Sequence, residues 1–271
     1  MDTNKEQWIE NYARFGVAAK GVVYCLVGIL AAMAATGNGG QTTGKSGVFK
    51  TILAQPFGQI LLGLVAFGLL GYVTWRFIQA IKDPNNKGND AKGIATRLGY
   101  AFSGVVYLAL AISAISLLFG QSGGSGGSGG SGDSRELLVS KLLEQPFGQW
   151  LVGLVAVGTV AKGIYQIYRA LSGNYMKNVK SMNLEHKVRE FIKHAGQVGY
   201  IARGVVLGIV GYFFFRAAVE ANPNQAGGTS EAFSFLQNTS GPWLLAAVAL
   251  GLTGYGIFMF VKAKYGRFAI A

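Results

Sequence analysis

Charged side chains are scarce in this sequence. They make up 13% of its 271 residues, while hydrophobic residues make up 51%. Soluble domains carry about 25% charged residues, roughly twice this share. So little charge disfavours a soluble fold, and it directs attention to long apolar runs.

Residues that support catalysis or metal binding are also few. There is a single cysteine, Cys25, so neither an intrachain disulfide nor a multi-cysteine metal site can form. The two histidines, His186 and His194, stand eight positions apart in a basic stretch. Acid–base and metal chemistry require clusters of His, Cys, Asp or Glu. We therefore expect no enzyme, no metal and no cofactor.

The residues in excess are basic residues and glycine. The formal net charge is +12, and there are 41 glycines. The Lys and Arg residues mostly flank apolar runs, which indicates membrane topology and anionic lipid rather than nucleic acid. We expect membrane lipids as partners, anionic ones included, and no nucleic acid. A homo-oligomer or a protein partner stays open.

Six runs are long enough to cross a bilayer as helices, which requires about 20 mostly apolar residues. A lone strand of that length would leave its backbone unpaired in lipid. The first run is too long for the apolar part of a signal peptide. The six expected spans are about 15–36, 57–81, 97–119, 147–170, 196–219 and 242–263.

The flanking charges predict the orientation. Lys and Arg are concentrated in the N-terminal flank, in 82–97, in 169–193 and in 262–267, and they are few in the intervening loops. Cytoplasmic loops carry such an excess. We expect both termini in the cytoplasm.

The odd-numbered spans share one pattern. The first reads Arg-Phe-Gly from Arg14 and Gly-Val-Val-Tyr from Gly21, and the third reads Arg-Leu-Gly from Arg97 and Gly-Val-Val-Tyr from Gly104. In the fifth, Gly199 and Gly204 keep the same spacing of five.

The even-numbered spans share another pattern. Gln-Pro-Phe-Gly-Gln opens the second span at Gln55 and the fourth at Gln145, and Gly-Leu-Val-Ala follows in both. The sixth has diverged to Gly-Pro-Trp at Gly241. Three tandem copies of one helical hairpin are therefore expected, because internal repeats dictate a fold.

The hairpins divide the single membrane domain into repeats at 8–82, 92–171 and 183–264. Each repeat has two spans, so all share one orientation, and a pseudo-threefold bundle about the membrane normal is the simplest arrangement. Short segments before the even spans, at 45–54, 134–144 and 230–238, are expected to form helices at the outer interface. Residues 121–133 have the composition of a flexible Gly/Ser loop, either natural or engineered.

These paired motifs resemble those of the bacterial membrane proteins grouped as domain of unknown function 1206. The resemblance covers nearly the whole chain. It implies the three-hairpin, all-α membrane architecture and a bacterial inner membrane, and it implies no activity and no functional residues.

Cations inside spans are the first candidates for function, because charge at membrane depth is costly. Lys20 and Arg203 occupy one repeat position, where the second repeat has Ser103. With Arg76 and Lys162 they lie at one level, roughly 9–11 Å inside the basic boundary at 1.5 Å per residue. They predict a cationic pocket that faces the cytoplasm and suits an anion or an anionic head group. The alternative is that their long side chains reach the interface, as we expect for Arg216.

Aromatic residues and glycines accompany these cations. Tyr72, Trp75 and Tyr165 are candidates to line the pocket, or else to pack or to form an interfacial belt. The repeated glycines are predicted to be sites of close helix packing. They are Gly16, Gly21, Gly63, Gly68, Gly99, Gly104, Gly153, Gly158, Gly199, Gly204 and Gly251.

Two functions from different classes fit these features. The first is a non-enzymatic module that binds lipid, another amphiphile or a partner protein. The second is a small transporter or channel for an anion or an amphiphilic solute. Parallel repeats suit the second, whereas the lack of membrane carboxylates disfavours proton coupling.

Overall fold

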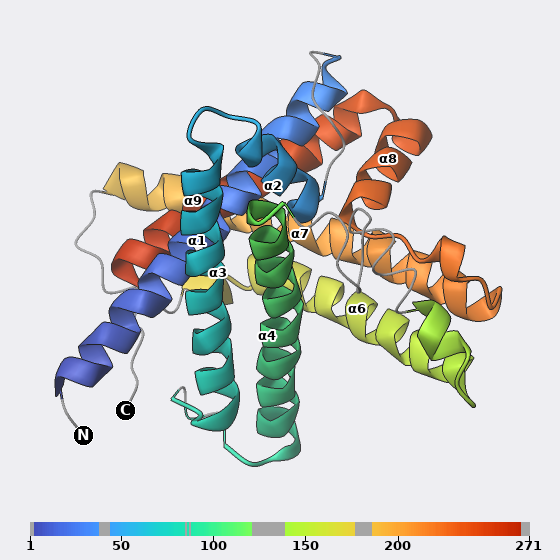
Figure 1. Cartoon of the computed structure of the whole chain (residues 1–271), viewed down its shortest axis with the longest axis horizontal. Coiled ribbons are helices and arrows are strands. Elements are labelled where there is room, and N and C mark those ends of the chain that lie inside the picture. Colours follow the sequence, from blue (N-terminus) through green and yellow to red (C-terminus); the bar gives the residue numbers. More distant parts are fainter. Residues whose placement is uncertain are drawn as a thin grey trace.

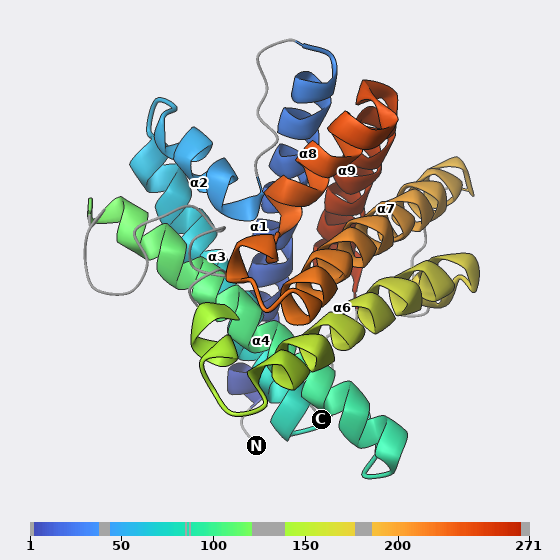
Figure 2. The same ribbon diagram turned by 90° about the vertical axis from the view of Figure 1, so that its right-hand side faces the viewer.

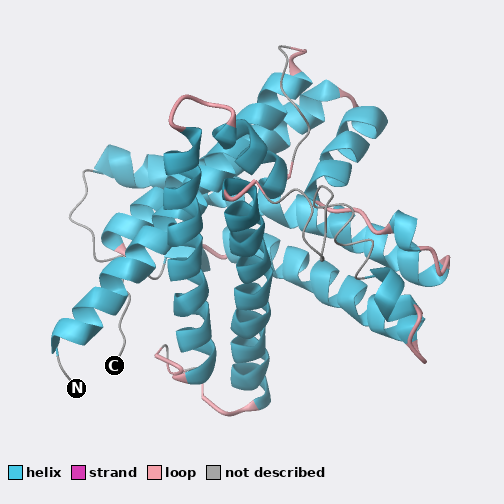
Figure 3. Ribbon diagram, in the orientation of Figure 1, coloured by secondary structure: helices cyan, strands magenta, loops and turns pink. Residues whose placement is uncertain are grey.

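The computed structural model describes residues 3–37, 44–84, 86, 88–120, 139–176 and 186–266. Within these ranges the protein is helical and contains no strand (Figure 3). The predicted Gly/Ser loop at 121–133 lies outside the described residues.

Six long helices dominate the fold (Figure 1). All six are long and apolar enough to span a membrane, which confirms the prediction of six candidate spans. Two of them, α1 and α7, extend well beyond the apolar runs at their N-terminal ends. The six are α1 (Thr3–Ala35), α3 (Gly58–Ile81), α4 (Ala91–Leu118), α6 (Gly148–Leu171), α7 (His186–Val219) and α9 (Pro242–Tyr265).

Short helices precede the even-numbered spans. These are α2 (Lys45–Leu53), residues 139–143 and α8 (Thr229–Ser240), with 3₁₀ turns at Asn174–Met176 and Pro223–Gln225. Phe49 of α2 and Phe233 of α8 are completely buried in the protein. The short helices therefore cover the bundle with an apolar face. Their position at a membrane interface stays a prediction.

The Gln-Pro-Phe-Gly motif turns the chain into α3 and α6. Phe57 and Phe147 adopt left-handed backbone angles, with φ of 60° and 66°. The glycine that follows each of them packs on the preceding short helix, where a Cβ atom would overlap backbone carbonyls. The repeated motif thus encodes a strained turn between two helices.

The six long helices pack side by side in an arc. Its order is α4, α3, α1, α9, α7 and α6, with the closest packing in the pairs α1–α9, α6–α7 and α3–α4. Figure 2 shows α1, α9, α7 and α6 next to one another. Each of the closest pairs joins two different repeats.

Contacts between repeats involve equivalent positions. A Cβ on Gly21 would meet the ring of Phe260 at 3.3 Å, and one on Gly104 would meet the ring of Phe77 at 3.2 Å. A Cβ on Gly204 would lie 2.6 Å from the side chain of Ile167. Phe77, Ile167 and Phe260 occupy one position of the repeat, so the three interfaces are built alike.

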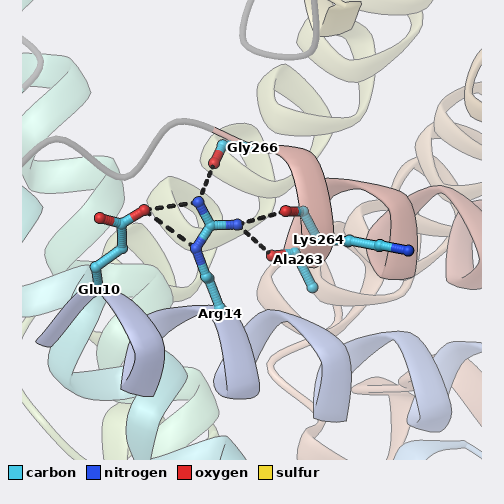
Figure 4. A network of polar contacts seen from close by, with 5 residues as sticks. All are labelled: Glu10, Arg14, Ala263, Lys264 and Gly266. Atoms are coloured by element: carbon cyan, nitrogen blue, oxygen red, sulfur yellow. Dashed lines mark hydrogen bonds and ion pairs between the residues drawn. The ribbon is translucent and has the colours of Figure 1, made fainter. Parts of the chain in front are cut away.

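Arginine side chains cap helix ends across two of these interfaces. Arg14 of α1 donates to the carbonyl oxygens of Ala263, Lys264 and Gly266 at the end of α9, at 2.6–3.1 Å (Figure 4). Arg97 of α4 donates in the same way to Ala80 and Ile81 at the end of α3. These carbonyls have no partner within their helices, which is why a cation there is stabilising.

The second hairpin differs from the other two. Helix α1 packs on α3, and α7 packs on α9, but α4 has no comparable contact with α6. The share of the span that is buried is 28% for α4 and 22% for α6, against 50% for α1, α3 and α9. In Figure 1 the α3–α4 and α6–α7 pairs point in different directions. The arc is therefore open between α4 and α6.

Candidate functional site

Lys20 lies at the centre of the arc. It is 2% exposed, and its ammonium donates to the hydroxyl of Tyr72 at 3.1 Å. Four tyrosine rings surround the ammonium, with centroids 4.6–5.8 Å away, and belong to Tyr24, Tyr72, Tyr107 and Tyr255. Cation–π attraction of this kind is worth about 2 kcal/mol or more when the cation is desolvated.

Arg76 of α3 reaches the same tyrosine. Its Nε donates to the Tyr72 hydroxyl at 2.7 Å, and its Nη2 donates to the same oxygen. A third bond runs from Nη1 to Oε1 of Gln79 at 2.9 Å. Arg76 therefore points into the protein and not toward the interface.

Arg203 of α7 completes the group. Its Nη1 donates to the Tyr255 hydroxyl at 2.8 Å, and its guanidinium lies 5.3 Å from the ring centroid of Tyr24. The hydroxyl of Tyr107 donates in turn to that of Tyr24 at 3.4 Å. We call these side chains the cation–tyrosine cluster: Lys20, Arg76, Arg203, Tyr24, Tyr72, Tyr107 and Tyr255.

Every spanning helix except α6 contributes to the cluster. Lys20 and Tyr24 are four residues apart on α1, as are Tyr72 and Arg76 on α3, so each pair lies on one helix face. The close approach of the helices depends on glycine. A Cβ on Gly199 would lie 2.6 Å from the backbone nitrogen of Tyr255, and Gly16 has equally little space beside Tyr72.

Lys162 of α6 occupies the repeat position of Tyr72, and it lies against α4. Its ammonium lies 5.5 Å from the ring centroid of Phe102 on α4. Tyr165 is 59% exposed, whereas Trp75 is buried. Arg216 forms an ion pair with Glu220 near the other end of α7. The structure therefore brings together three of the four predicted cations.

Further positive charge continues from the cluster toward the helix ends. Arg169 of α6 lies over the ring of Tyr200, at 5.3 Å, and Arg76 lies over that of Tyr100, at 5.2 Å. Lys262 of α9 lies close enough to both arginines for their like charges to repel. These residues extend the positive electrostatic potential of the cluster toward the ends of α3, α6 and α9, where the basic flanks lie.

The repeated glycines separate into two groups. A Cβ would meet another helix closer than 3.4 Å at Gly16, Gly21, Gly68, Gly104, Gly199, Gly204 and Gly251. Gly63 and Gly153 each have one side chain at 4.0 Å, and Gly99 and Gly158 have nothing within 4 Å. The last two belong to the hairpin that is open.

Sequence reasoning missed Tyr24 and Tyr107 as site residues, although both end the Gly-Val-Val-Tyr motif. The available signal was their spacing, because each lies four residues after the polar position occupied by Lys20 and Ser103. In the third repeat Leu207 stands at this position, so the tyrosine pattern is incomplete there.

The cluster offers hydrogen-bond donors of the kinds that bind anions in proteins. Arginine offers a planar fork of donors, and lysine offers a compact charge. A tyrosine hydroxyl that accepts from a cation can still donate its own proton to an anionic oxygen. Among the residues that the structure describes, no group of three His, Cys, Asp or Glu side chains is placed to hold a metal ion.

Comparison with known proteins agrees with the fold. A family model for a Domain of Unknown Function (DUF1206) matches residues 15–83, 98–173 and 198–266, one match for each repeat. The chain is 35% identical over 259 residues to the uncharacterized protein YxxB of Bacillus subtilis (strain 168). The aligned region covers 95% of this chain and 91% of that protein. No solved structure matches. On its three repeats and its six apolar helices, the chain belongs to the DUF1206 family.

Proposed function

We propose that the protein is a non-enzymatic membrane module that binds the anionic head group of a lipid or similar amphiphile at the cation–tyrosine cluster. One observation carries the proposal. Lys20, Arg76 and Arg203 converge from three helices, in stretches of sequence without acidic residues. No Asp or Glu occurs in 11–82, 91–132, 145–184, 191–219 or 232–271.

The physical argument is the cost of like charges at membrane depth. Three cations around shared tyrosines repel one another, and a site of low dielectric strengthens this repulsion. Neutral tyrosine hydroxyls solvate each cation but do not cancel its charge. A phosphate or carboxylate group supplies the missing negative charge and several acceptor oxygens for charge-assisted hydrogen bonds.

The orientation of the protein belongs to the same proposal. The basic flanks favour an orientation with both termini and the ends of α3, α6 and α9 in the cytoplasm of a bacterial cell. Arg169 and Lys262 would then attract anionic head groups of the inner leaflet. The equivalent contacts between repeats support a pseudo-threefold arrangement about the membrane normal.

Native mass spectrometry of the intact protein tests the proposal. The protein is reconstituted with equimolar phosphatidylglycerol and phosphatidylcholine, extracted gently, and the retained lipids are counted. Wild type should retain phosphatidylglycerol preferentially. Arg203→Ala should weaken that preference by about tenfold, because a hydrogen bond to a charged group contributes about 1.5–3 kcal/mol.

Arg216→Ala is the matched control, because it removes the same side chain from the same helix outside the cluster. It should leave the preference unchanged. Equal retention of the two lipids by wild type would contradict the proposal. So would an equal loss of preference in the two arginine variants.

Anion transport is a second candidate, favoured by the continuation of the cluster through Arg76, Arg169 and Lys262 toward the basic end. Liposomes containing the protein would then take up chloride or phosphate, and Arg203→Ala would slow the uptake. Flux no greater than in empty liposomes for both ions would leave binding as the function.

A further inference from the structure

The opening between α4 and α6 has a cause in the sequence. In the first and third hairpins the helices cross where an alanine meets a glycine. A Cβ on Gly251 would lie 2.6 Å from the Cβ of Ala202, and Gly68 has the same relation to Ala19. The second repeat keeps the glycine, Gly158, but it has Phe102 in place of the alanine.

At a second position of the crossing, the second repeat again has a larger residue than the other two repeats. Gly71 and Gly254 pack against the backbone carbonyl oxygens of Tyr12 and Ala195. The equivalent residue of α6 is Ala161. Phe102 and Ala161 together add a ring and a methyl group where the other hairpins have no space, so α4 and α6 cannot pack in the same way.

Lys162 and Gln166 are polar side chains on one face of α6, the helix that forms one side of this opening. Lys162 lies against Phe102, and Gln166 follows it by one helical turn. Gln166 is 5% exposed, and neither polar atom of its amide has a hydrogen-bond partner in the protein. A buried amide left in this state costs free energy, which a ligand that accepts and donates hydrogen bonds recovers.

The chemistry around Gln166 indicates a ligand with acceptor oxygens. At the equivalent position of α3, Arg76 donates to Tyr72, one turn before it. In α6 the residue one turn before Gln166 is Lys162, whose ammonium only donates. A phosphate oxygen accepts from the lysine ammonium and from the glutamine amide together.

We infer that the opening between α4 and α6 is a binding site for one anionic phospholipid, with its phosphate at Lys162 and Gln166. Its acyl chains lie on the exposed apolar faces, which include Val105 of α4 and Leu154 and Val157 of α6. The opening lies within the spanning ranges, so the bilayer supplies this occupant directly. The inference rests on the proposed function for the class of ligand.

The opening itself is tested by alanine substitution at equivalent glycines, with thermal unfolding in lipid nanodiscs as the readout. Gly16→Ala and Gly199→Ala should lower Tm by about 5 °C or more, because the added methyl meets the backbone of another helix. Gly99→Ala should leave Tm unchanged or raise it, since that site is empty and alanine favours helix. If Gly99→Ala lowered Tm as much as Gly16→Ala does, α4 and α6 would be packed together, and the inference would be overturned.

The occupant is tested by the retention of phosphatidylglycerol and phosphatidylcholine, measured by native mass spectrometry on folded, monodisperse protein. Lys162→Ala and Gln166→Leu should each lower phosphatidylglycerol retention, the former by about tenfold. The double variant Phe102→Ala/Ala161→Gly, which restores the residues of the other hairpins, should lower retention of both lipids. In that background Gly99→Ala should become destabilising.

Failure of the inference is distinguishable from failure of the proposed function. A wild-type preference for phosphatidylglycerol that disappears in Arg203→Ala, but persists in Lys162→Ala, Gln166→Leu and the double variant, overturns only the site between α4 and α6. Equal retention of the two lipids by wild type overturns both.

Discussion

At the residue scale, four of the seven cluster residues form two pairs spaced four apart. Lys20 and Tyr24 form one pair, and Tyr72 and Arg76 form another. The sequence predicted which cations lie at one depth, because depth follows from helix length alone. It did not predict which of them meet, because that depends on the rotation of each helix. Lys162 is predicted at the same depth as the others, and the structure places its ammonium against the ring of Phe102 on α4.

Tyr175 provides a pH prediction at this scale. It lies in the 3₁₀ turn after α6, it is 2% exposed, and its hydroxyl donates to the carbonyl oxygen of Lys193 at 2.6 Å. Burial raises the pKa of Tyr175 above its usual value of 10. The native state therefore holds this proton more tightly than the unfolded state does. Its contribution to stability is fully present below pH 10 and is lost as the pH rises above 10.

Thermal unfolding at pH 8 and pH 10.5 measures this effect. Wild type should lose more Tm between the two pH values than Tyr175→Phe does. Tyr165→Phe, at an exposed position outside the turn, should behave like wild type. An identical loss in wild type and Tyr175→Phe would show that this hydroxyl does not titrate differently on folding.

At the element scale, the arginines of two odd-numbered spans, Arg14 and Arg97, cap the ends of other helices. The sequence predicted that Arg14 and Arg97 are equivalent, but it did not indicate their partners. A repeat shows which positions are alike and does not show what they contact. The structure places both guanidinium groups on the carbonyls of the even helix from the neighbouring repeat.

Removal of one such cap should destabilise the protein. Arg14→Ala loses bonds to three carbonyl oxygens and the ion pair with Glu10. We expect a loss of about 1–3 kcal/mol, since these bonds involve a charged donor and the group is only partly exposed. Arg14→Lys should recover little, because an ammonium does not reproduce the planar fork.

Arg216→Ala is again the control, because it breaks one exposed i,i+4 ion pair and caps no other helix. Such pairs contribute about 0–1 kcal/mol. Denaturant titration in mild detergent measures all three variants. If Arg14→Ala and Arg216→Ala lost the same free energy of unfolding, the contacts of Arg14 with the end of α9 would not stabilise the protein.

At the scale of the whole molecule, the sequence predicted the number of spans, their order and the repeat. It did not predict that the closest packing would join different repeats, or that one hairpin would be open. Both depend on the fit between helix faces. The cause of the opening is visible in the sequence only after Phe102 is compared with Ala19 and Ala202 at a crossing that the structure identifies.

Orientation is the prediction that belongs to this scale. A fluorescent protein fused after Ala271 should fluoresce, because it folds in the cytoplasm, and alkaline phosphatase inserted within 121–132 should be active, because it matures outside. The reverse fusions, with phosphatase at the C-terminus and the fluorescent protein in the loop, should be inactive. The opposite pattern of activities would invert the proposed topology.

The contact between Arg14 and the end of α9 also has a consequence for biosynthesis. The two partners are 249 positions apart, so the ribosome must complete six spans before α1 acquires its main neighbour. Until then the part of α1 that packs on α9, which includes Gly21, is open to lipid or to an insertion factor. The final helix can therefore dock onto the first only after the last span is made, and a nascent chain stalled before α9 would leave that part of α1 uncovered.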